Sequence, residues 1–371
     1  MPVRWNYVRW IQDLLDTTSE EYSERYDPER EVVGLDIGTG ASAIYSMLGC
    51  SSRLNWRMAA TDIDQHSLDY ARRNVNANHS QLGKRVKVFA TTNDAPLIPM
   101  DKLGLEELDF VMTNPPFYSS KADMEASYES KKEPPSAANM ASENEAICPG
   151  GDVGFVTRIF RESLILREKV QWYTAMLAKL SSLQQIVAKL KEHNVSNFAV
   201  TNLQAGHKTR RWAIAWSFQD FRPRNDIARH GELVHAVLPQ PTAQTIELPS
   251  MSVKWAGEKV NTALKGLDVR WQWRPLHAAG VMEAKGNVWG RAARRKKQFA
   301  LQSGKSDRNL NSVIEKSGKH KDNDSDEEAP IALAAKVTCR EEEVEIRWLR
   351  GTDRILFESF YGMLRSALAQ P

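Results

Sequence analysis

The stretch Gly34-Leu35-Asp36-Ile37-Gly38-Thr39-Gly40-Ala41-Ser42 decides the fold class of this 371-residue chain. It overlaps the apolar run Val32–Ile37, which predicts a short buried β-strand that ends at the first loop glycine. A carboxylate followed by Gly-x-Gly at the carboxyl end of a strand lets a ligand approach the backbone closely, and ligands of open α/β sheets bind at that edge. A purely structural turn would need the glycines but not Asp36.

Strand and helix candidates alternate outward from this stretch. We expect further strands over residues 57–61, 86–90, 108–113 and 211–218, and helices over 41–49, 65–76, 155–180 and 181–193. This alternation is typical of an α/β domain with a parallel sheet. Residues 1–220 are therefore expected to form one Rossmann-like domain.

A second acidic residue, Asp62, ends the next strand candidate, about 20 residues beyond the glycine loop, where a ribose-hydroxyl acceptor is expected. NAD sites show the same feature. The loop lacks the third glycine of a dinucleotide site, however, which makes a pyrophosphate a poor fit. Thr39 and Ser42, in place of small apolar residues, suit a cofactor with an amino-acid tail.

The motif Thr113-Asn114-Pro115-Pro116-Phe117 decides between these cofactors. Two successive prolines fix the backbone and remove two N–H donors, so the Asn114 side-chain oxygen and a proline carbonyl can both accept hydrogen bonds from one planar NH₂ group. Phe117 offers a face on which the ring of that group can stack. An amine held in this way directs its lone pair at an electrophile, as methyl transfer from S-adenosylmethionine requires, and needs no metal.

The composition excludes several other classes of protein. With 42% hydrophobic and 26% charged residues, the chain is typical of globular proteins. No apolar run approaches the roughly 18 residues of a membrane span, and the residues after Met1 do not form a secretory signal. Cys50, Cys148 and Cys339 form no Cys-x-x-Cys pair and do not cluster with histidines, so no metal site is expected.

The net charge of +3 is distributed unevenly. Residues 1–220 carry 25 basic and 28 acidic side chains, whereas residues 251–321 carry 16 basic and 5 acidic ones. Such a basic block favours a polyanion, such as nucleic acid, as partner, with a solvated basic surface as the alternative.

Composition also divides the chain beyond the first domain. The proline-containing segment 221–250 is expected to be a linker, and residues 251–371 a small α+β domain. In that domain we expect helices over 258–267 and 353–369 and strands over 269–274 and 343–349. The polar segment 303–330 is expected to be a disordered insertion. Segment 119–151 of the first domain is expected to be a long loop that is either functional or disordered.

The Asn-Pro-Pro-Phe sequence at 114–117 resembles the signature of methyltransferases that act on adenine N6 or on glutamine. Three further stretches narrow the resemblance: Pro2-Val3-Arg4-Trp5-Asn6-Tyr7, Gly150-Gly151-Asp152-Val153-Gly154-Phe155-Val156 and Arg211-Trp212-Ala213-Ile214-Ala215-Trp216-Ser217-Phe218. Together they are similar to the methyltransferase-like sixteen family, the eukaryotic N6-adenosine methyltransferases of U6 small nuclear RNA, whose bacterial relatives methylate an adenine of large-subunit (23S) ribosomal RNA. The resemblance covers residues 2–220.

This resemblance implies a class I S-adenosylmethionine-dependent enzyme that methylates N6 of a flipped adenosine in structured RNA, with U6 as the expected substrate. It implies that Arg4 contacts the methionine carboxylate of the cofactor, that Asp62 holds the ribose, and that Asn114 and Pro115 grip the N6 amine while Phe117 stacks on the base. The remaining residues implied are Asp36, Gly38, Thr39, Gly40 and Ser42 for the cofactor and Pro116 for the catalytic motif.

For RNA contacts, the resemblance points to Lys131 and Lys132 in the long loop and to Lys208, Arg210 and Arg211 before the closing strand. The C-terminal region is similar in pattern to the RNA-binding region of the vertebrate members, which has a kinase-associated-one-like fold. There, phosphates could be contacted by Arg291, Arg294, Arg295, Lys296 and Lys297. A solvated charge run and a nuclear-import signal are the alternatives for that basic run.

The expected partner is structured RNA, with no membrane and no metal, and the expected location is the nucleus, with the cytoplasm as a second location. Members of the family carry a basic extension before the stretch at 2–7, so we expect weaker RNA binding from this part of the chain. Two other functions stay open at this point: a protein-glutamine N5-methyltransferase, and a non-catalytic RNA-binding protein that senses the cofactor.

Overall fold

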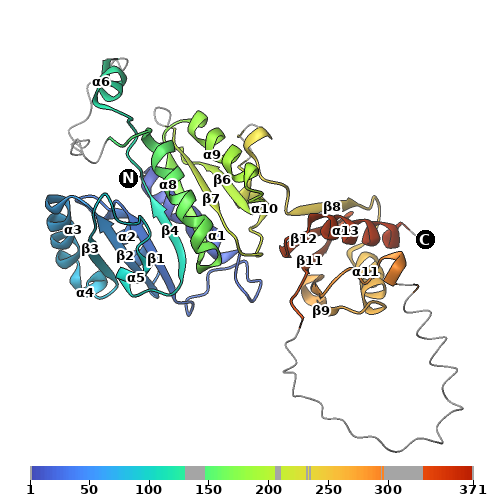
Figure 1. The fold of residues 1–371 in the computed structure, drawn as a ribbon. Helices are drawn as coiled ribbons and strands as arrows, with labels where there is room; N and C mark the ends of the chain where they lie inside the picture. Colours follow the sequence, from blue (N-terminus) through green and yellow to red (C-terminus); the bar gives the residue numbers. More distant parts are fainter. Residues whose placement is uncertain are drawn as a thin grey trace, which may run out of the picture. The chain divides into compact units, whose positions relative to one another are not determined.

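The computed structural model describes residues 2–129, 147–204, 210–230, 233, 235–293, 295 and 329–369. The chain forms two compact units, Met1–Pro241 and Thr242–Pro371, each with a sheet of its own (Figure 1).

The first unit is built around a seven-stranded sheet with the order β3-β2-β1-β4-β5-β7-β6. The strands β1 to β5 pair in parallel, and β7 lies antiparallel between β5 and β6. This arrangement confirms the expected Rossmann-like α/β domain. The strands span Val32–Ile37 (β1), Trp56–Asp62 (β2), Val86–Ala90 (β3), Leu108–Thr113 (β4), Val170–Leu177 (β5), Phe198–Asn202 (β6) and Trp212–Trp216 (β7).

Helices cover both faces of this sheet (Figure 1). One buried cluster joins α1, α2, α3, α4 and α10 to the strands, and a second cluster joins α5, α8 and α9 to them. The helices span Pro2–Asp16 (α1), Ile44–Ser52 (α2), Gln65–Ala77 (α3), His79–Leu82 (α4), Met100–Leu103 (α5), Lys121–Glu129 (α6), Gly151–Leu166 (α8), Leu180–Glu192 (α9) and Asn225–Ala228 (α10), with 3-10 turns at Arg167–Lys169 and His235–Val237.

The helix expected over 155–180 is wrong in its second half. The chain leaves α8 at Leu166 and enters β5, the eight residues of which are all buried. A strand covered on both faces is mostly apolar and lacks the alternation of polar and apolar residues that distinguishes a strand from a buried helix. The short strand β6 was missed for the same reason, since its first four residues are all buried.

The expected linker at 221–250 is replaced by packed structure. Phe221, Arg222 and Ile227 are buried in the first unit, and the indole Nε1 of Trp10 in α1 donates to the carbonyl of Ile227 at 3.0 Å. The boundary between the units lies at Pro241, after which the chain enters the sheet of the second unit. Prolines in this segment therefore mark irregular backbone that packs on the sheet rather than a free spacer.

The second unit is an antiparallel sheet with the order β8-β12-β11-β10-β9, which confirms the expected α+β class. Alternate residues of the strands face a core that they share with α11 and α13, where Trp348 stacks on Phe357 at 5.2 Å. Asp353 caps α13 by accepting from the amides of Ile355 and Leu356. The elements are Ala243–Glu247 (β8), Val253–Lys265 (α11), Arg270–Arg274 (β9), a 3-10 turn at Pro275–His277, Ala279–Ala284 (β10), Leu333–Arg340 (β11), Glu343–Arg350 (β12) and Arg354–Leu368 (α13).

Two expected loops fall largely outside the described residues. Of segment 303–330 only residues 329 and 330 are described, and segment 119–151 is described at both ends, where it includes α6 and a bridge between Tyr118 and Ile147. Among the described residues, no helix is long and apolar enough to cross a bilayer. The same residues contain no group of three or more His, Cys, Asp or Glu side chains that could hold a metal ion.

Candidate active site

The carboxyl ends of β1, β2 and β4 meet at one edge of the first sheet, because these strands are parallel neighbours. Gly38 and Gly40 follow β1 with positive φ angles of 70° and 62°, which favour glycine. The backbone amides of Gly38 and Thr39 both donate to the carbonyl of Thr61 in β2 at 2.9 Å. The glycine loop is therefore fixed to the neighbouring strand, and Gly38 itself is exposed at the sheet edge.

Asp36 is fully buried beneath this loop. Its Oδ2 accepts from the hydroxyl of Thr39 at 2.7 Å and from that of Ser46 at 3.1 Å, whereas its Oδ1 has no hydrogen-bond partner within the described part of the chain. Burial raises the pKa of Asp36 to about 6, and the nearby charge of Asp62 acts in the same direction. The two hydroxyls lower it only in part.

Asp62, at the end of β2, holds the far side of the loop. Its Oδ2 accepts from the amide of Gly40 at 2.8 Å and its Oδ1 from the amide of Asp64 at 3.0 Å. Asp64 in turn caps α3 by accepting from the amide of Ser67. Asp62 therefore ties the glycine loop to the start of α3, and each carboxylate oxygen keeps a second lone pair for another donor.

The Asn-Pro-Pro-Phe loop begins where β4 ends. The hydroxyl of Thr113 donates to the carbonyl of Ile37 at 2.9 Å, which places this loop beside the glycine loop. The Asn114 side chain is half-buried, and its Oδ1 is a buried acceptor for which the described residues provide no donor. Buried polar atoms are normally hydrogen-bonded, so an exception at a conspicuous motif calls for an external donor.

Two tyrosines that the sequence did not single out as site residues lie beneath these loops. The hydroxyl of Tyr7 shares a 2.7 Å hydrogen bond with the hydroxyl of Thr174 in β5, and the Tyr7 ring meets the ring of Tyr45 edge to face at 6.0 Å. Burial raises the pKa of Tyr45, and the nearby positive charge of Arg4 opposes that rise. The exposed Arg4 of α1 therefore lies close to Tyr45.

Arg211, just before β7, reaches the Asn-Pro-Pro-Phe loop. Its guanidinium carbon lies 5.0 Å from the centre of the Phe117 ring, a distance typical of cation–π contacts. Burial lowers the pKa of Arg211, and the side chains of Tyr118, Tyr45 and Asp152 oppose this effect. Arg211 therefore belongs to the same cluster as the Asn-Pro-Pro-Phe loop, although the sequence placed it only among RNA contacts.

Asp152 is a further buried carboxylate that sequence reasoning missed. Its Oδ2 accepts from the amide of Ala178 at 2.9 Å and its Oδ1 from the hydroxyl of Ser182 at 2.9 Å. These contacts join the start of α8 to the turn that leads from β5 into α9. In the sequence, only its position in the Gly-Gly-Asp stretch at 150–152 could have pointed to Asp152 as a buried carboxylate of the site.

The structure brings together most of the predicted cofactor and catalytic residues. Asp36, Gly38, Thr39, Gly40 and Asp62 form the glycine-loop side, Asn114 to Phe117 form the facing loop, and Ser42 is exposed just after the glycines. Among the predicted RNA contacts, Arg210 is exposed before β7, and Arg291 and Arg295 are exposed in the second unit. Arg211 is partly exposed beside the Phe117 ring, and the other six lie outside the described residues: Lys131, Lys132, Lys208, Arg294, Lys296 and Lys297.

Comparisons with known proteins place this site in a family. Residues 1–220 match the profile of an RNA methyltransferase family, Methyltransf_10. A U6 small nuclear RNA (adenine-(43)-N(6))-methyltransferase of Schizosaccharomyces pombe is 32% identical over 99% of this chain and 86% of its own length. An RNA N(6)-adenosine-methyltransferase of Danio rerio is 37% identical over 60% of this chain, which spans less than half (45%) of that relative.

Among solved structures, one similar chain is the catalytic domain of human Mettl16 in complex with a MAT2A 3'UTR hairpin, with a sequence identity of 34%. The match covers 59% of this chain and 72% of that chain, with a TM-score of 0.49. The sequence matches carry the assignment, because they extend over the glycine loop, the Asn-Pro-Pro-Phe loop and, for the fission yeast relative, nearly the whole chain. The chain belongs to the METTL16 family of S-adenosylmethionine-dependent RNA adenine-N6 methyltransferases.

Proposed function

We propose that this chain transfers a methyl group from S-adenosylmethionine to N6 of an adenosine in U6 small nuclear RNA. The observation that carries the proposal is the Asn114 Oδ1 atom, a buried acceptor without a donor among the described side chains and backbone groups. It lies in the loop beside the glycine loop, where an exocyclic amine can supply the missing hydrogen bond.

The residues of the glycine loop fit the cofactor. Gly38 faces open space, so that even an added Cβ would meet no atom within 4 Å, and Asp36 Oδ1 is a second buried acceptor without a described donor. Asp62 would hold the ribose through its remaining lone pairs, and Arg4 would hold the methionine carboxylate. When bound, the cofactor supplies an electrophilic methyl group.

The chain's own residues position the nucleophile. Asn114 Oδ1 and the carbonyl of Pro115 would each accept one hydrogen of the adenine amine, which leaves the nitrogen lone pair free for the methyl group. The base would stack on Phe117, and Arg211 lies over that ring. The adenosine must leave its stack to reach this loop, as in other enzymes that modify bases. Glutamine, the other substrate of Asn-Pro-Pro-aromatic motifs, is disfavoured by the family of this chain.

RNA binding would involve both units. We assign phosphate contacts to Arg210 and Arg211 near the catalytic loop and to Arg291 and Arg295 in the second unit, all of which are described and at least partly exposed. The second unit, an antiparallel sheet with two packed helices, is compatible with a kinase-associated-one-like fold. A U6 substrate implies work in the nucleus, which is where we place the protein.

The Asn114→Ala variant tests this function. We expect its turnover on a U6-like hairpin to fall by about 100-fold or more, since one preorganised hydrogen-bonding group is commonly worth that much, while its affinity for the hairpin is retained. The exposed Asn76 on α3 provides the control variant Asn76→Ala, which should leave turnover unchanged. Unchanged turnover of Asn114→Ala under saturating cofactor would contradict the proposal.

A further inference from the structure

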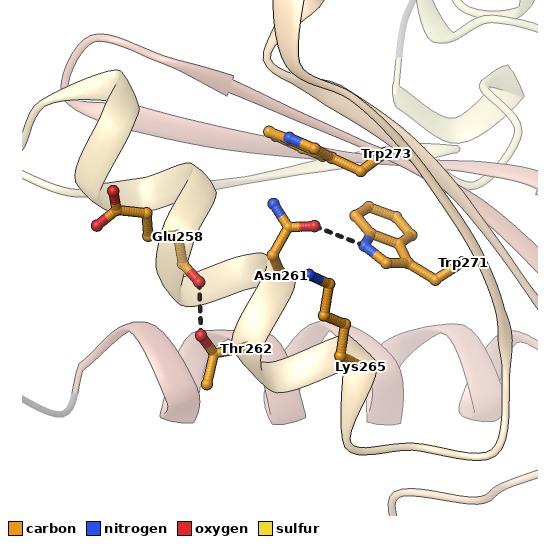
Figure 2. Close-up of a pocket in the computed structure, with 6 residues that line it drawn as sticks. All are labelled: Glu258, Asn261, Thr262, Lys265, Trp271 and Trp273. Carbon is orange, nitrogen blue, oxygen red and sulfur yellow. Dashed lines mark hydrogen bonds between the residues drawn. The ribbon is translucent and has the colours of Figure 1, made fainter.

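The second unit contains a pocket of about 500 Å³ between α11 and β9, far in the sequence from the catalytic motifs. We call it the indole groove. Figure 2 shows Asn261 and Lys265 extending from α11 toward two tryptophans of β9, while the carboxylate of Glu258 points away from them. The groove is lined by Glu258, Asn261, Thr262, Lys265, Trp271 and Trp273.

The two indoles of the groove are held in a fixed arrangement. Trp271 and Trp273 stack on one another with ring centres 5.8 Å apart and planes inclined by 30°. The Nε1 of Trp271 donates to Asn261 Oδ1 at 2.9 Å, and Asn261 Nδ2 donates to the carbonyl of Gly257 at 2.8 Å. The amide thus fixes the indole through two hydrogen bonds within the unit.

Two glycines make room for these rings. A Cβ added to Gly280 in β10 would lie 2.3 Å from Cη2 of Trp271, and one added to Gly257 in α11 would lie 3.1 Å from Cζ2 of Trp273. The indoles nevertheless stay partly exposed, whereas Trp289 and Trp348 of the same unit are only 3% exposed. The part of the indole surface that stays exposed in the groove is available to a ligand.

The charge around the groove selects the sign of its ligand. Residues 253–274, which span α11 and β9, carry five basic and two acidic side chains. Lys265 brings an ammonium group into the groove itself. A cation such as a methylated lysine, which pairs of aromatic rings also bind, would be repelled by that ammonium, whereas an anion would be attracted.

We infer that the indole groove binds an unpaired nucleotide of RNA, with the base stacked on the exposed indole surface and its phosphate beside Lys265. Stacking on aromatic side chains tolerates any base, because every base has a π-face, so we expect little sequence preference. This inference rests on the proposed function, since it gives the RNA substrate a second contact in the unit that lacks the catalytic motifs.

The test compares full-length variants for binding of a fluorescein-labelled, unstructured single-stranded RNA of about 12 nucleotides, within the range of known single-strand sites. Trp273 lines the groove, so Trp273→Leu removes the π-face and leaves a smaller apolar side chain, whereas Trp273→Phe keeps a π-face. Stacking of one base is worth enough for Trp273→Leu to weaken binding by about fivefold to 100-fold, with Trp273→Phe much closer to wild type.

Lys265→Glu should weaken the same RNA binding without changing the stacked Trp271 and Trp273 rings. The matched control is Leu276→Ala, at a 97% exposed residue outside the groove. Equal RNA affinity in Trp273→Leu, Lys265→Glu and wild type would overturn the inference. So would binding of a trimethyl-lysine peptide that Lys265→Glu strengthens. Methylation of a hairpin is measured in parallel. If Trp273→Leu binds RNA more weakly but the wild type does not methylate the hairpin, the inference about the groove holds and the proposed function is wrong.

Discussion

At the scale of single residues, the site combines buried acceptors with few donors. Asp36 is the clearest example, because it is fully buried and its Oδ1 has no hydrogen-bond donor among the described residues. Its pKa of about 6 exceeds the ordinary 3.8, so the folded protein binds this proton more tightly than the unfolded chain does. Its contribution to stability is therefore complete below pH 3.8 and is lost as the pH rises through about 6.

The Asp36→Asn variant makes this prediction measurable. Asparagine keeps an acceptor for Thr39 and Ser46 but does not titrate. We expect the free energy of unfolding of the wild type to fall between pH 5 and pH 8 by about 1 kcal/mol more than that of Asp36→Asn. Urea denaturation at the two pH values measures the difference, and an identical pH dependence of both proteins would contradict the raised pKa.

Site residues that belong to local sequence motifs could be predicted from the sequence. Site residues that are brought together only by contacts between distant segments could not. Asp36, Asp62 and Asn114 each end a strand in a recognisable pattern, and the structure brings all three to one sheet edge. Tyr45 and the stacking of Arg211 on Phe117 depend on contacts between segments that are far apart in the chain. No local pattern encodes such contacts.

At the scale of elements, the same distinction holds. The strands β1, β3 and β4 coincide with their predicted bounds because short apolar runs end there at turns. The strand β5 lies within the helix predicted over 155–180, because it is buried on both faces and follows α8 after only a 3-10 turn at Arg167–Lys169. The short helix α10 was hidden in a proline-containing segment, yet it contacts both α1 and β6.

The packing of α10 on the first unit predicts how the stability of that unit depends on where the chain is truncated. A chain of residues 1–220 loses Phe221, Ile227 and Val237 from the core, and with Ile227 the partner of the Trp10 indole. Burial of such side chains contributes about 1.5–3 kcal/mol each, so we expect this chain to be less stable than residues 1–241 by about 3 kcal/mol or more. Thermal and urea unfolding of the two chains test this; equal stabilities would show that residues 221–241 are the spacer that composition suggested.

At the scale of the whole molecule, charge is separated between the units. Residues 1–220 carry 25 basic and 28 acidic side chains and are nearly balanced, whereas residues 251–321 carry 16 basic and 5 acidic ones. Neutralised phosphates release counterions, so the number of phosphates that the protein neutralises sets the salt dependence of RNA binding. The small net charge of the chain thus conceals a basic segment at residues 251–321, of the sign that RNA attracts.

Deletion of residues 242–371 should therefore weaken RNA binding and make it less dependent on salt. We expect the slope of log affinity against log salt to become shallower by roughly 0.7 to 0.9 for each phosphate that the shortened chain no longer neutralises. Fluorescence anisotropy between about 50 and 200 mM salt measures the slope, and unchanged cofactor binding serves as the control for folding. An unaltered affinity and slope would place the electrostatic contacts in the first unit.

We propose that Asn114 and its neighbours hold the N6 amine of an adenine in RNA for methyl transfer. The most direct measurement is the mapping of N6-methyladenosine in total RNA incubated with the purified chain and isotope-labelled S-adenosylmethionine, with Asn114→Ala in parallel. We expect label at N6 of an adenosine in U6 small nuclear RNA with the wild type and none with Asn114→Ala. Label on glutamine side chains of protein instead of RNA, or equal labelling of RNA by both proteins, would contradict it.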